Sequence, residues 1–547
     1  MMEEDDTYVL CGPEPFEPVP KVSLGRYYYN ALSTTTVNYY AMVDYETKET
    51  LTYQELLDYS CILADYLQEN GYGITDSVMS ISSQNNIYFY VPVFACLYMG
   101  VVVAPLNHNY TVEELRHTLN ISKPQVIFCS HMVIDKYLKL KNELNFIEKI
   151  FIIDSEKENL GAPSLINILK TRYATCNKWR SFQPLDGDPE KLNAFIMCSS
   201  GTTGLPKGVL QSHLNILVRL NHQRDPRYQP TEEGLKVIGL LPFFHGFGLL
   251  TNLGAILRKI QVVILKRFNE DQFLQAIQDH KINLLWLAPP IVVFLAKSPK
   301  VLKYDLSSVV ELISGAAPLG KNTEEQLKKR VKIEKIFQAY GLTEATLAVC
   351  LMQRNEGAKQ GSSGKVVPFM KMKIRDPETG KSLGPKKVGE ICVKGPMVMV
   401  GYYGNEKATK ESFTSDGWLK TGDLGYYDEE GYFYIVDRLK ELIKYKGFQV
   451  APAELEALLL KHPKIRDCGV VGLPDELSGE LPLAFVVKRE DADLNEKEIE
   501  EFVKKQVSNP KWLRGGVIFV NEIPKNASGK ILRRDLRQML KIFKNKL

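Results

Sequence analysis

One loop of the chain combines the residue types that bind phosphate. Cys198 to Gly208 reads CSSGTTGLPKG. Its glycines allow several backbone N–H groups to turn toward one anion, and Lys207 adds a mobile cation. Common nucleotide loops place Ser or Thr directly after Gly-Lys, whereas here Pro206 precedes the lysine and Gly208 follows it. The composition favours phosphate binding over a plain flexible turn, with candidates Ser199, Ser200, Gly201, Thr202, Thr203, Gly204 and Lys207.

A second segment, Gln338 to Glu344, reads QAYGLTE and offers three groups to a nucleotide. The ring of Tyr340 has a flat face for a base, Thr343 has a hydroxyl for a phosphate, and Glu344 has a carboxylate of the kind that Mg²⁺ prefers. The same letters fit a strand-to-helix turn with Gly341 at a positive φ and Thr343 as a helix cap. Both interpretations stay open on these residues alone.

Two segments nearer the C-terminus add an acid and a lysine. In KTGDLG, Asp423 is an acidic residue of the type that binds ribose hydroxyls, and Arg438 could join it there. In NASGK, Lys530 could neutralise charge that develops when a carboxylate attacks an α-phosphate. Taken singly, these residues are more typical of a turn, a surface ion pair and a solvated lysine.

The elements that must position these groups alternate between strand and helix. Short β-branched runs are separated by segments with helical spacing of apolar residues, which predicts an α/β domain with largely parallel sheets. The expected strands are Val78–Ser82, Val101–Ala104, Gln125–Cys129, Ile150–Asp154 and Ala194–Met197, and the expected helices include Tyr53–Asn70 and Thr111–Leu119.

The last quarter of the chain reads as a separate α+β unit of normal domain size. It follows a mixed charged run at Asp437–Glu441, where we place a hinge, although the run by itself is equally typical of a solvated charged loop. We expect a large domain over residues 1–437, a hinge at 438–441 and a small mobile domain over 442–547. Its expected helices are Ala453–His462 and Glu496–Val507, and its expected strands are Cys468–Leu473, Leu483–Lys488 and Gly516–Val520.

Composition excludes several classes of protein. The 547 residues carry a net charge of 69 − 65 = +4, too small for a strong field toward nucleic acid or an anionic membrane. The nine cysteines form no Cys-x-x-Cys pair, which argues against a zinc site and a disulfide framework and suggests a reducing compartment. The acidic N-terminal MMEEDDTYVL lacks the apolar core of a signal peptide.

One uncharged stretch, Ile87 to Leu106, has about the length of a membrane-spanning helix. Pro92, Gly100 and Pro105 interrupt it, so we expect a buried helix capped by Asn86 and ended by Gly100, followed by a buried strand. No transmembrane segment is therefore expected.

The final residues Asn545-Lys546-Leu547 are close to the Ser-Lys-Leu peroxisomal address, with asparagine as a departure. They predict recognition by a peroxisomal import receptor. The alternative is an accidental basic tail on a cytoplasmic protein.

Taken together and in order, the motifs resemble one family. SSGTTGLPKG, AYGLTE, TGDLGYYDEEGYFYIVDRLKELIKYKG and IPKNASGK are similar to the adenylate-forming superfamily of acyl-CoA synthetases, beetle luciferases and peptide-synthetase adenylation domains. A closer resemblance, to beetle luciferases and their insect fatty-acyl-CoA synthetase relatives, rests on QRDPRY, LAKSP, YDLSS, GAAPLG, ELIKYKG, VAPAELE and LRGG. The resemblance covers essentially the whole chain.

The resemblance implies a fold and a two-step reaction. The large domain would combine α/β subdomains with parallel sheets and a β-barrel-like part. A carboxylate would attack the α-phosphate of Mg·ATP to give an acyl-adenylate and pyrophosphate, and the thiol of CoA would then displace AMP. In luciferases, O₂ chemistry replaces or accompanies the second step. The implied cofactors and substrates are therefore ATP, Mg²⁺ and CoA, with O₂ in the luciferase case.

The resemblance also assigns roles by position. Residues 199–208 match the β/γ-phosphate loop and Thr343 the α-phosphate contact. Asp423 matches the ribose-binding acid and Arg438 its partner. Glu344 matches the magnesium ligand and Lys530 the adenylation lysine. Further nucleotide-side positions are Ala317, Ala339 (where glycine is usual), Tyr340 and Gly341.

Other matched positions concern the acid and the second step. His245 is placed beside the substrate carboxylate, although a lone histidine among aromatic residues is more often a core residue. Lys440 falls at the hinge, and Lys444 and Gly447 fall on the face presented for thioester formation. A single small domain would thus present two faces to one site.

The acyl pocket decides between substrates. By resemblance it comprises Arg219, Phe247, Thr251, Trp286, Ser314, Gly315, Leu347 and Ala348. Beetle luciferases resemble each other in having serine where this chain has Leu347. Leucine cannot hydrogen-bond a heteroaromatic nitrogen, at a cost of about 1–3 kcal/mol for the unpaired group, and it extends the apolar wall.

Three hypotheses follow. The first is a synthetase for medium- to long-chain fatty acyl-CoA, and the second is a light-producing luciferin monooxygenase, whether weak or strong. A non-catalytic nucleotide-binding relative is disfavoured because Lys530, Glu344 and Asp423 are all present.

Overall fold

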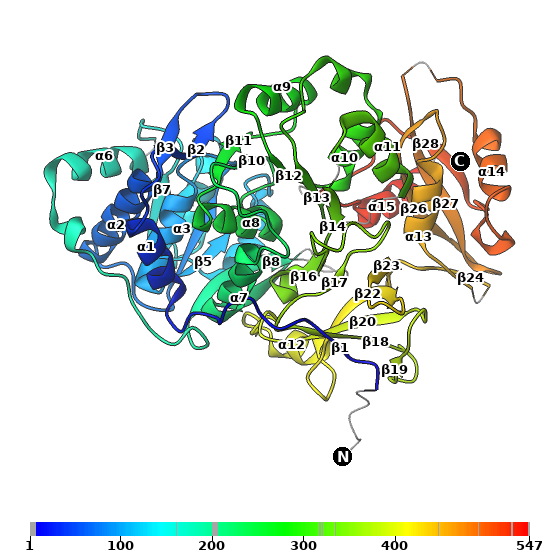
Figure 1. Ribbon diagram of the computed structural model, residues 1–547, viewed down its shortest axis with the longest axis horizontal. Helices are drawn as coiled ribbons and strands as arrows, with labels where there is room; N and C mark the ends of the chain where they lie inside the picture. Colours follow the sequence, from blue (N-terminus) through cyan, green and yellow to red (C-terminus); the bar gives the residue numbers. More distant parts are fainter. Residues whose placement is uncertain are drawn as a thin grey trace.

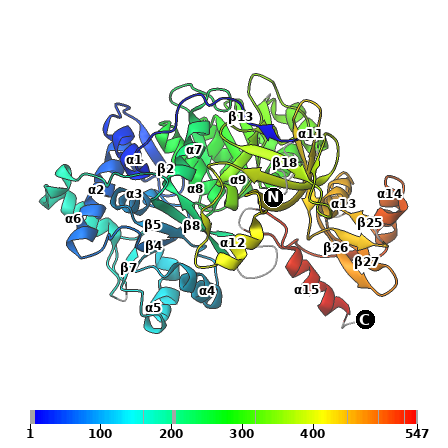
Figure 2. The same ribbon diagram turned by 90° about the horizontal axis from the view of Figure 1, so that it is seen from below.

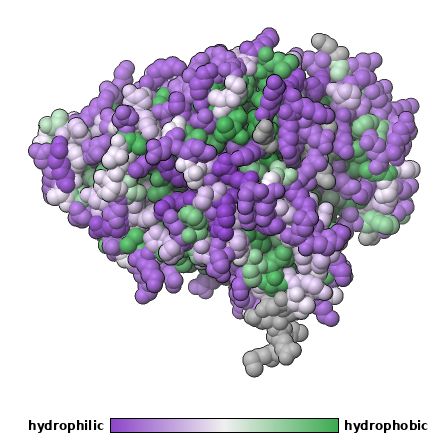
Figure 3. All heavy atoms as spheres, in the orientation of Figure 1, coloured by the Kyte–Doolittle hydropathy of each residue, from purple (hydrophilic) through white to green (hydrophobic). Residues whose placement is uncertain are grey.

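The computed structural model describes residues 7–159, 161–199, 206–316, 319, 321–333, 335–446, 448–490, 492–526 and 529–544. The chain runs through two α/β units and an antiparallel β unit, and ends in a smaller α+β unit at the right of Figure 1. Figure 3 shows that this face carries mainly hydrophilic residues, with hydrophobic residues in smaller patches.

The first unit is built on a seven-stranded sheet with the order β21-β9-β8-β5-β4-β6-β7. Five strands run parallel, namely β8, β5, β4, β6 and β7. β9 pairs antiparallel with β8, and β21 pairs antiparallel with β9. The bounds are β4 Val78–Ser82, β5 Val102–Pro105, β6 Val126–Cys129, β7 Lys149–Ile152, β8 Asn193–Ser199, β9 Lys207–Ser212 and β21 Gly401–Tyr402.

Helices around this sheet begin where the sequence offers caps. α2 (Tyr53–Glu69) and α4 (Val112–Ser122) each start after a threonine whose hydroxyl accepts the backbone N–H of a glutamate three residues later. The side chain of that glutamate in turn accepts the backbone N–H of the threonine. The others are α1 Leu24–Ser33, α3 Tyr90–Met99, α5 Ile134–Glu143, α6 Leu165–Thr175 and α7 His213–Arg224, with short 3₁₀ turns η1 His131–Val133 and η2 Lys178–Ser181.

The segment from Ile87 to Leu106 forms the expected buried helix and strand. All ten residues of α3 are buried, and Gly100 ends the helix at φ 73° before β5 begins. The expectation for Asn86 is wrong. The helix starts after Phe89 without a side-chain cap, and Asn86 instead accepts the backbone N–H of Tyr88. Within the described residues, no helix combines the length and apolar character needed to cross a membrane.

The second unit has a seven-stranded sheet with the order β14-β13-β12-β10-β11-β2-β3, parallel except for the β2–β3 pair. Its strands are β2 Tyr40–Asp44, β3 Thr50–Thr52, β10 Lys236–Gly239, β11 Gln261–Ile264, β12 Leu284–Leu287, β13 Glu311–Ser314 and β14 Lys335–Gln338. Its helices are α8 Gly246–Leu257, α9 Glu270–His280, α10 Pro289–Lys297 and α11 Lys321–Val331, with η3 at Pro299–Lys303.

The third unit is antiparallel. Its main sheet has the order β1-β18-β20-β22-β23, with β19 attached to β18, and β15, β16 and β17 form a small sheet beside it. The bounds are β1 Leu10–Cys11, β15 Tyr340–Leu342, η4 Thr343–Ala345, β16 Leu347–Leu351, β17 Lys365–Val366, β18 Lys371–Arg375, β19 Ser382–Leu383, β20 Gly389–Lys394, α12 Glu406–Ser412, β22 Leu419–Tyr427 and β23 Phe433–Arg438.

The last unit has its own core and a five-stranded sheet, β25-β24-β27-β26 with β28 beside β27. The mixed α/β class and the smaller C-terminal unit agree with expectation. The bounds are β24 Ile443–Tyr445, β25 Phe448–Val450, α13 Pro452–Leu459, β26 Ile465–Asp475, β27 Gly479–Lys488, α14 Glu496–Lys504, η5 Asn509–Lys511, β28 Gly516–Phe519 and α15 Arg533–Lys544. In the view of Figure 2, α15 leads to the C-terminus on the side of this unit.

Candidate functional site

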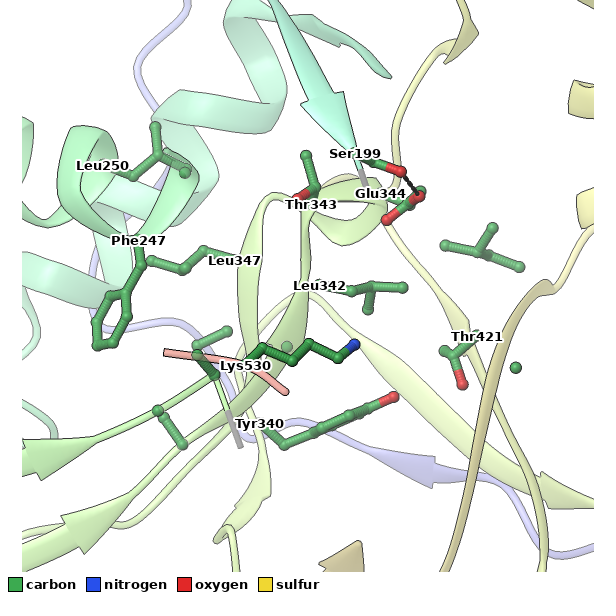
Figure 4. A pocket seen from close by; sticks show the side chains of 18 of the residues that line it. Ser199, Phe247, Leu250, Tyr340, Leu342, Thr343, Glu344, Leu347, Thr421 and Lys530 are labelled. Carbon is green, nitrogen blue, oxygen red and sulfur yellow. Dashed lines mark hydrogen bonds between the residues drawn. The ribbon is translucent and has the colours of Figure 1, made fainter. Parts of the chain in front are cut away.

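A cavity of about 640 Å³ lies where the units meet. Its wall combines α7, the start of α8, the β15–β16 hairpin, β22 and the loop that carries Lys530. Figure 4 shows Phe247, Leu250 and Leu347 on one side of this space and Lys530 and Tyr340 below it, with Glu344 and Ser199 at another edge. The cavity therefore has an apolar side and a polar side.

The acid Asp423 is 7% exposed and lines the neighbouring cleft of about 960 Å³, which shares Tyr340, Arg438 and Lys530 with the cavity. It lies on β22 directly opposite Arg438 on β23, whose Nε is 3.2 Å from its Oδ1. The hydroxyl of Tyr340 donates to Oδ2 at 2.8 Å, and burial together with the charge of Asp423 raises the pKa of this tyrosine well above its usual value. Tyr340, Asp423 and Arg438, for which the sequence suggested a role in binding a nucleoside, are thus in contact.

Glu344 is held at a second polar corner. Its Oε1 accepts hydrogen bonds from the hydroxyl of Ser199 at 2.8 Å and from that of Tyr402 at 3.0 Å. Lys207, the first residue of β9, lies with Nζ 4.6 Å from the centre of the Tyr402 ring. Mg²⁺ is typically bound by one or two carboxylates together with substrate phosphates and water, and this corner offers one fixed carboxylate beside hydroxyl and cationic neighbours. The donor set fits a magnesium–triphosphate complex.

Lys530 and His245 lie close enough for their charges to interact. Burial, and then the charge of Arg438, lowers the pKa of Lys530 to about 8, which Asp423 and Glu441 partly oppose. Burial, followed by the charge of Lys530, lowers the pKa of His245 to about 4. The histidine is therefore neutral near pH 7. Its Nδ1 accepts the backbone N–H of Phe247 at 3.3 Å, so the ring proton lies on Nε2 and can be donated.

The apolar side of the cavity is formed by buried and half-buried residues of three elements. Phe247 and Leu250 come from α8, Trp286 from β12, and Leu347 and Ala348 from β16. Thr251 and Gly315 also line the wall, as expected. Apart from Thr251, whose hydroxyl donates to the carbonyl of Phe247, these groups offer hydrocarbon surface to a ligand.

One cation interrupts this apolar surface. Arg219 of α7 is 4% exposed, and its Nε and Nη1 have no hydrogen-bond partner. Burial lowers the pKa of this guanidinium to about 10. Gln223 lies one turn further along α7 and also lines the cavity, with Oε1 lacking a partner. A buried unpaired guanidinium is costly unless a ligand supplies an acceptor.

The hairpin that carries Leu347 is strained. Thr346 and Leu347 have φ values of 52° and 83°, which non-glycine residues rarely adopt. The alternative interpretation of QAYGLTE, with Gly341 at a positive φ, is wrong. Gly341 belongs to β15, and a Cβ there would lie 1.6 Å from the carbonyl oxygen of Leu347. The glycine is required by close approach of the opposite strand, which fixes Leu347 at the cavity wall.

Several expected residues lie elsewhere or beyond the described residues. Ser314 is buried in β13 and is not among the residues that line the cavity. Lys440 lines the cavity mouth in a turn after β23. Lys444 is exposed on β24 and lines neither this cavity nor the neighbouring cleft. Ser200, Gly201, Thr202, Thr203, Gly204, Ala317, Gly447 and Asn545–Leu547 lie outside the described residues.

Some site residues were not expected from the sequence. Tyr402 reaches Glu344 from a two-residue strand far along the chain, which no local pattern indicates. Gln223 could have been found from its spacing, because residues four apart on a helix share a face and Arg219 was already a candidate. The remaining additions include Gln211, Gln229, Leu250, Ile313, Leu342 and Leu351.

Two family descriptions match this chain. An AMP-binding enzyme domain matches residues 30–403, and an AMP-binding enzyme C-terminal domain matches residues 454–530. Luciferin 4-monooxygenase of Photuris pensylvanica is 45% identical over 99% of this chain and 100% of its own length. Probable 4-coumarate–CoA ligase 3 of Dictyostelium discoideum is 43% identical over 83% of this chain and 84% of its own.

Solved structures of MatB from Rhodopseudomonas palustris have a similar fold. The ATP-bound form is 26% identical, with a TM-score of 0.85 over 94% of this chain and 99% of that chain. The apo form of the same protein gives 0.73 over the same shares. The present structure is thus more similar overall to the ATP-bound form of that protein than to its apo form.

Proposed function

Because the chain belongs to the AMP-binding enzyme family and is thus an adenylate-forming enzyme, we propose that it activates a medium- or long-chain fatty acid as the acyl-adenylate and transfers the acyl group to CoA. ATP, Mg²⁺ and CoA are what enzymes of this family use. The observation that carries the choice of acid is Leu347, which adds hydrocarbon to a wall already formed by Phe247, Leu250 and Trp286.

The nucleotide would lie along the polar side of the cavity. Asp423, fixed by Tyr340 and Arg438, would accept hydrogen bonds from the ribose hydroxyls. Thr343 would donate to the α-phosphate, and Lys207 with the loop before it would bind the β- and γ-phosphates. Glu344 would hold Mg²⁺ together with phosphate oxygens, and the ion would neutralise charge on the leaving pyrophosphate.

Residues at the centre of the cavity would orient the acid. His245 is neutral and can donate its Nε2 proton to one carboxylate oxygen, which positions the acid without cancelling its charge. Lys530, when protonated, would neutralise charge that gathers between the carboxylate and the α-phosphate in the transition state. Electrostatic stabilisation of this kind is often the largest catalytic contribution.

The second step would use another face of the small domain. We place a large domain at residues 1–437, a hinge at 438–441 and the small domain at 442–547. Lys530 now faces the cavity, whereas Lys444 is exposed and outside it. Rotation about the hinge at Lys440 would withdraw Lys530 and present Lys444 and Gly447 to the acyl-adenylate for thioester formation.

A second candidate function, a luciferin monooxygenase that uses O₂ and produces light, is favoured by Arg219. Its unpaired guanidinium would be satisfied by an acid with an acceptor at the end remote from the carboxylate, which a plain alkyl chain lacks. The 45% identical Photuris protein has this activity in its name. Replacing Arg219 with Met would distinguish the two, because it should favour lauric acid and disfavour luciferin.

One experiment tests the proposal directly. The enzyme is given Mg·ATP with lauric acid and CoA, and in parallel Mg·ATP with luciferin and air, and products are quantified as thioester and emitted light. Abundant lauroyl-CoA with little light supports the synthetase. Bright emission without thioester contradicts it and supports the second candidate.

A further inference from the structure

Helix α10 (Pro289–Lys297) faces the small domain at both of its ends. The helix belongs to the large domain and packs beside α11, and the guanidinium of Arg330 donates to the carbonyl of Ala296 at 2.9 Å. Its nine residues span about 13 Å at 1.5 Å per residue. Two contacts at this separation can fix both the distance and the angle of a neighbouring domain, which a single contact cannot.

At the N-terminal end of α10, the contact is with the loop that carries Lys530. Gly529 has φ 80°, and a Cβ at this position would lie 3.2 Å from the Cβ of Ala288 and 3.3 Å from Cγ of Pro290. The glycine therefore permits both the backbone conformation and the close approach. This contact sets how near the Lys530 loop lies to the large domain.

At the C-terminal end of α10, the contact is a hydrogen bond. The Nζ of Lys297 donates to the carbonyl of Leu460 at 2.6 Å. Leu460 is the C-cap residue of α13, so this oxygen belongs to the end of a helix where carbonyls lack helical partners and where a cation is favoured. Lys297 is half-buried at this seam between the two domains.

Between the two contacts, the domains are separated by an open space. A cleft of about 960 Å³ is lined by Val293 and Phe294 of α10 and by Ala457 of α13. These apolar faces therefore line a cleft, which Tyr340, Asp423 and Lys530 also line, and do not pack directly against each other. The hydrogen bond from Lys297 to the small domain thus lies at the end of α10 that is remote from the Lys530 loop.

We propose that Lys297 is a positioning residue for adenylation, which holds the C-terminal end of α13 so that Lys530 stays in the cavity. The inference rests on the proposed function, because it assigns the present arrangement to the first step. Once the small domain rotates for thioester formation, the bond from Lys297 is broken. Lys297 therefore acts through Lys530 and contributes to the first step alone.

The test compares Lys297→Met, which keeps the aliphatic stem, with Lys297→Arg and with Lys300→Met. Lys300 is the matched control, because it lies three residues away but its Nζ pairs with Glu270 and Asp271 of the large domain. Adenylation is measured as pyrophosphate release with laurate and Mg·ATP in single turnover, and transfer is measured from added lauroyl-adenylate and CoA.

For Lys297→Met we expect the rate of adenylation to fall about five- to tenfold, because one charged hydrogen bond at a partly exposed seam is lost. The rate of acyl transfer to CoA should be unchanged or faster. Lys297→Arg should stay within about twofold of wild type, since it keeps the charge and donors. Lys300→Met should match wild type. Equal loss of both steps, or wild-type adenylation in Lys297→Met, would overturn the inference.

A second measurement does not depend on turnover. Hydrogen–deuterium exchange should be faster in Lys297→Met than in wild type over α13 and the peptide that carries residues 529–533, and unchanged over β4 and β5. Unchanged exchange at α13 would overturn the inference. If the wild-type enzyme adenylates no acid, the proposed function fails, and exchange still decides whether Lys297 holds the small domain.

Discussion

The two sides of the cavity are built by different physical means. At the nucleotide side, the two acids have fixed partners: Asp423 has Arg438 and Tyr340, and Glu344 has Ser199 and Tyr402. At the acyl side, the wall is mostly hydrocarbon, and the cation Arg219 has two nitrogens without partners among the described residues. The two acids at the nucleotide side are thus held in place by their partners, whereas a ligand with an acceptor atom would supply the partner that Arg219 lacks at the acyl side.

This difference explains why one half of the function is better defined than the other. Directional bonds among charged groups fix which atoms of ATP can fit, because unpaired buried charge is strongly unfavourable. A hydrocarbon wall discriminates by size and shape, at only about 1–3 kcal/mol per methylene. Changes at the nucleotide side should therefore abolish the chemistry, and changes at the acyl side should redirect it.

The largest effect is expected at the nucleotide side for Lys530→Ala. Adenylation should fall by about 10²–10³-fold, as for loss of other transition-state donors, while thioester formation from added acyl-adenylate should continue. Single-turnover assays of the two half-reactions measure this. Lys444→Ala is the matched control and should give the opposite pattern. If both variants lose both steps equally, the two faces of the small domain do not serve separate steps.

Asp423→Asn should have the next largest effect. It weakens charge-assisted hydrogen bonds to the ribose and leaves Arg438 without its anion, so KM for ATP should rise by about 10- to 100-fold. Initial rates at varied ATP measure it. Tyr340→Phe removes one hydroxyl from the same group and should raise KM only a few-fold. An unchanged KM in Asp423→Asn would remove this carboxylate from the nucleotide site.

A smaller effect, on selectivity, is expected at the acyl side for Leu347→Ser. The ratio of activities with luciferin and lauric acid should rise by about tenfold, because serine can hydrogen-bond a heteroaromatic nitrogen and the apolar wall shrinks. Competition between the two acids, with detection of both adenylates, measures the ratio. Leu347→Val keeps an apolar wall and should leave the ratio nearly unchanged. A rise of similar size in both variants would mean that space, rather than hydrogen bonding, sets the preference.

The smallest effect expected is on pH dependence. With the pKa of Lys530 lowered to about 8, the protonated form is complete below this pH and is lost as pH rises through it. The kcat/KM for adenylation, which reports the free enzyme, should therefore fall about twofold at pH 8 relative to pH 6.5. His245, with a pKa of about 4, stays neutral throughout this range. Lys530→Arg should move the fall to higher pH, and an unshifted fall would assign it to another group.

Sequence was sufficient for most of the fold and for proposing which residues bind the nucleotide. The buried strands β4 to β8 and the helices between them follow from β-branched runs and helical spacing, and α2 and α4 begin at recognisable threonine caps. Asp423, Glu344 and Lys530 could be identified because ordered motifs carry them. The role of Asn86 could not be predicted, because its side chain accepts the backbone N–H of Tyr88 in a local turn and does not cap the helix.

The acyl side could be predicted only in part. Leu347 lies at a positive φ, and its carbonyl oxygen approaches Gly341 of the opposite strand so closely that a Cβ there would clash, a tertiary contact absent from local patterns. Ser314 and its neighbour Gly315 illustrate the same limit, since only the second lines the cavity. Whether Arg219 has a hydrogen-bond partner depends on every side chain packed around it. Its unpaired nitrogens could therefore be recognised only in the three-dimensional structure.

The most direct measurement of the central claim, that this cavity adenylates a fatty acid, is acid-dependent exchange of labelled pyrophosphate into ATP. We expect rapid exchange with laurate in the presence of Mg²⁺, no exchange without acid, and almost none in Lys530→Ala. Exchange with luciferin but not with laurate, or exchange with laurate that survives in Lys530→Ala, would contradict it.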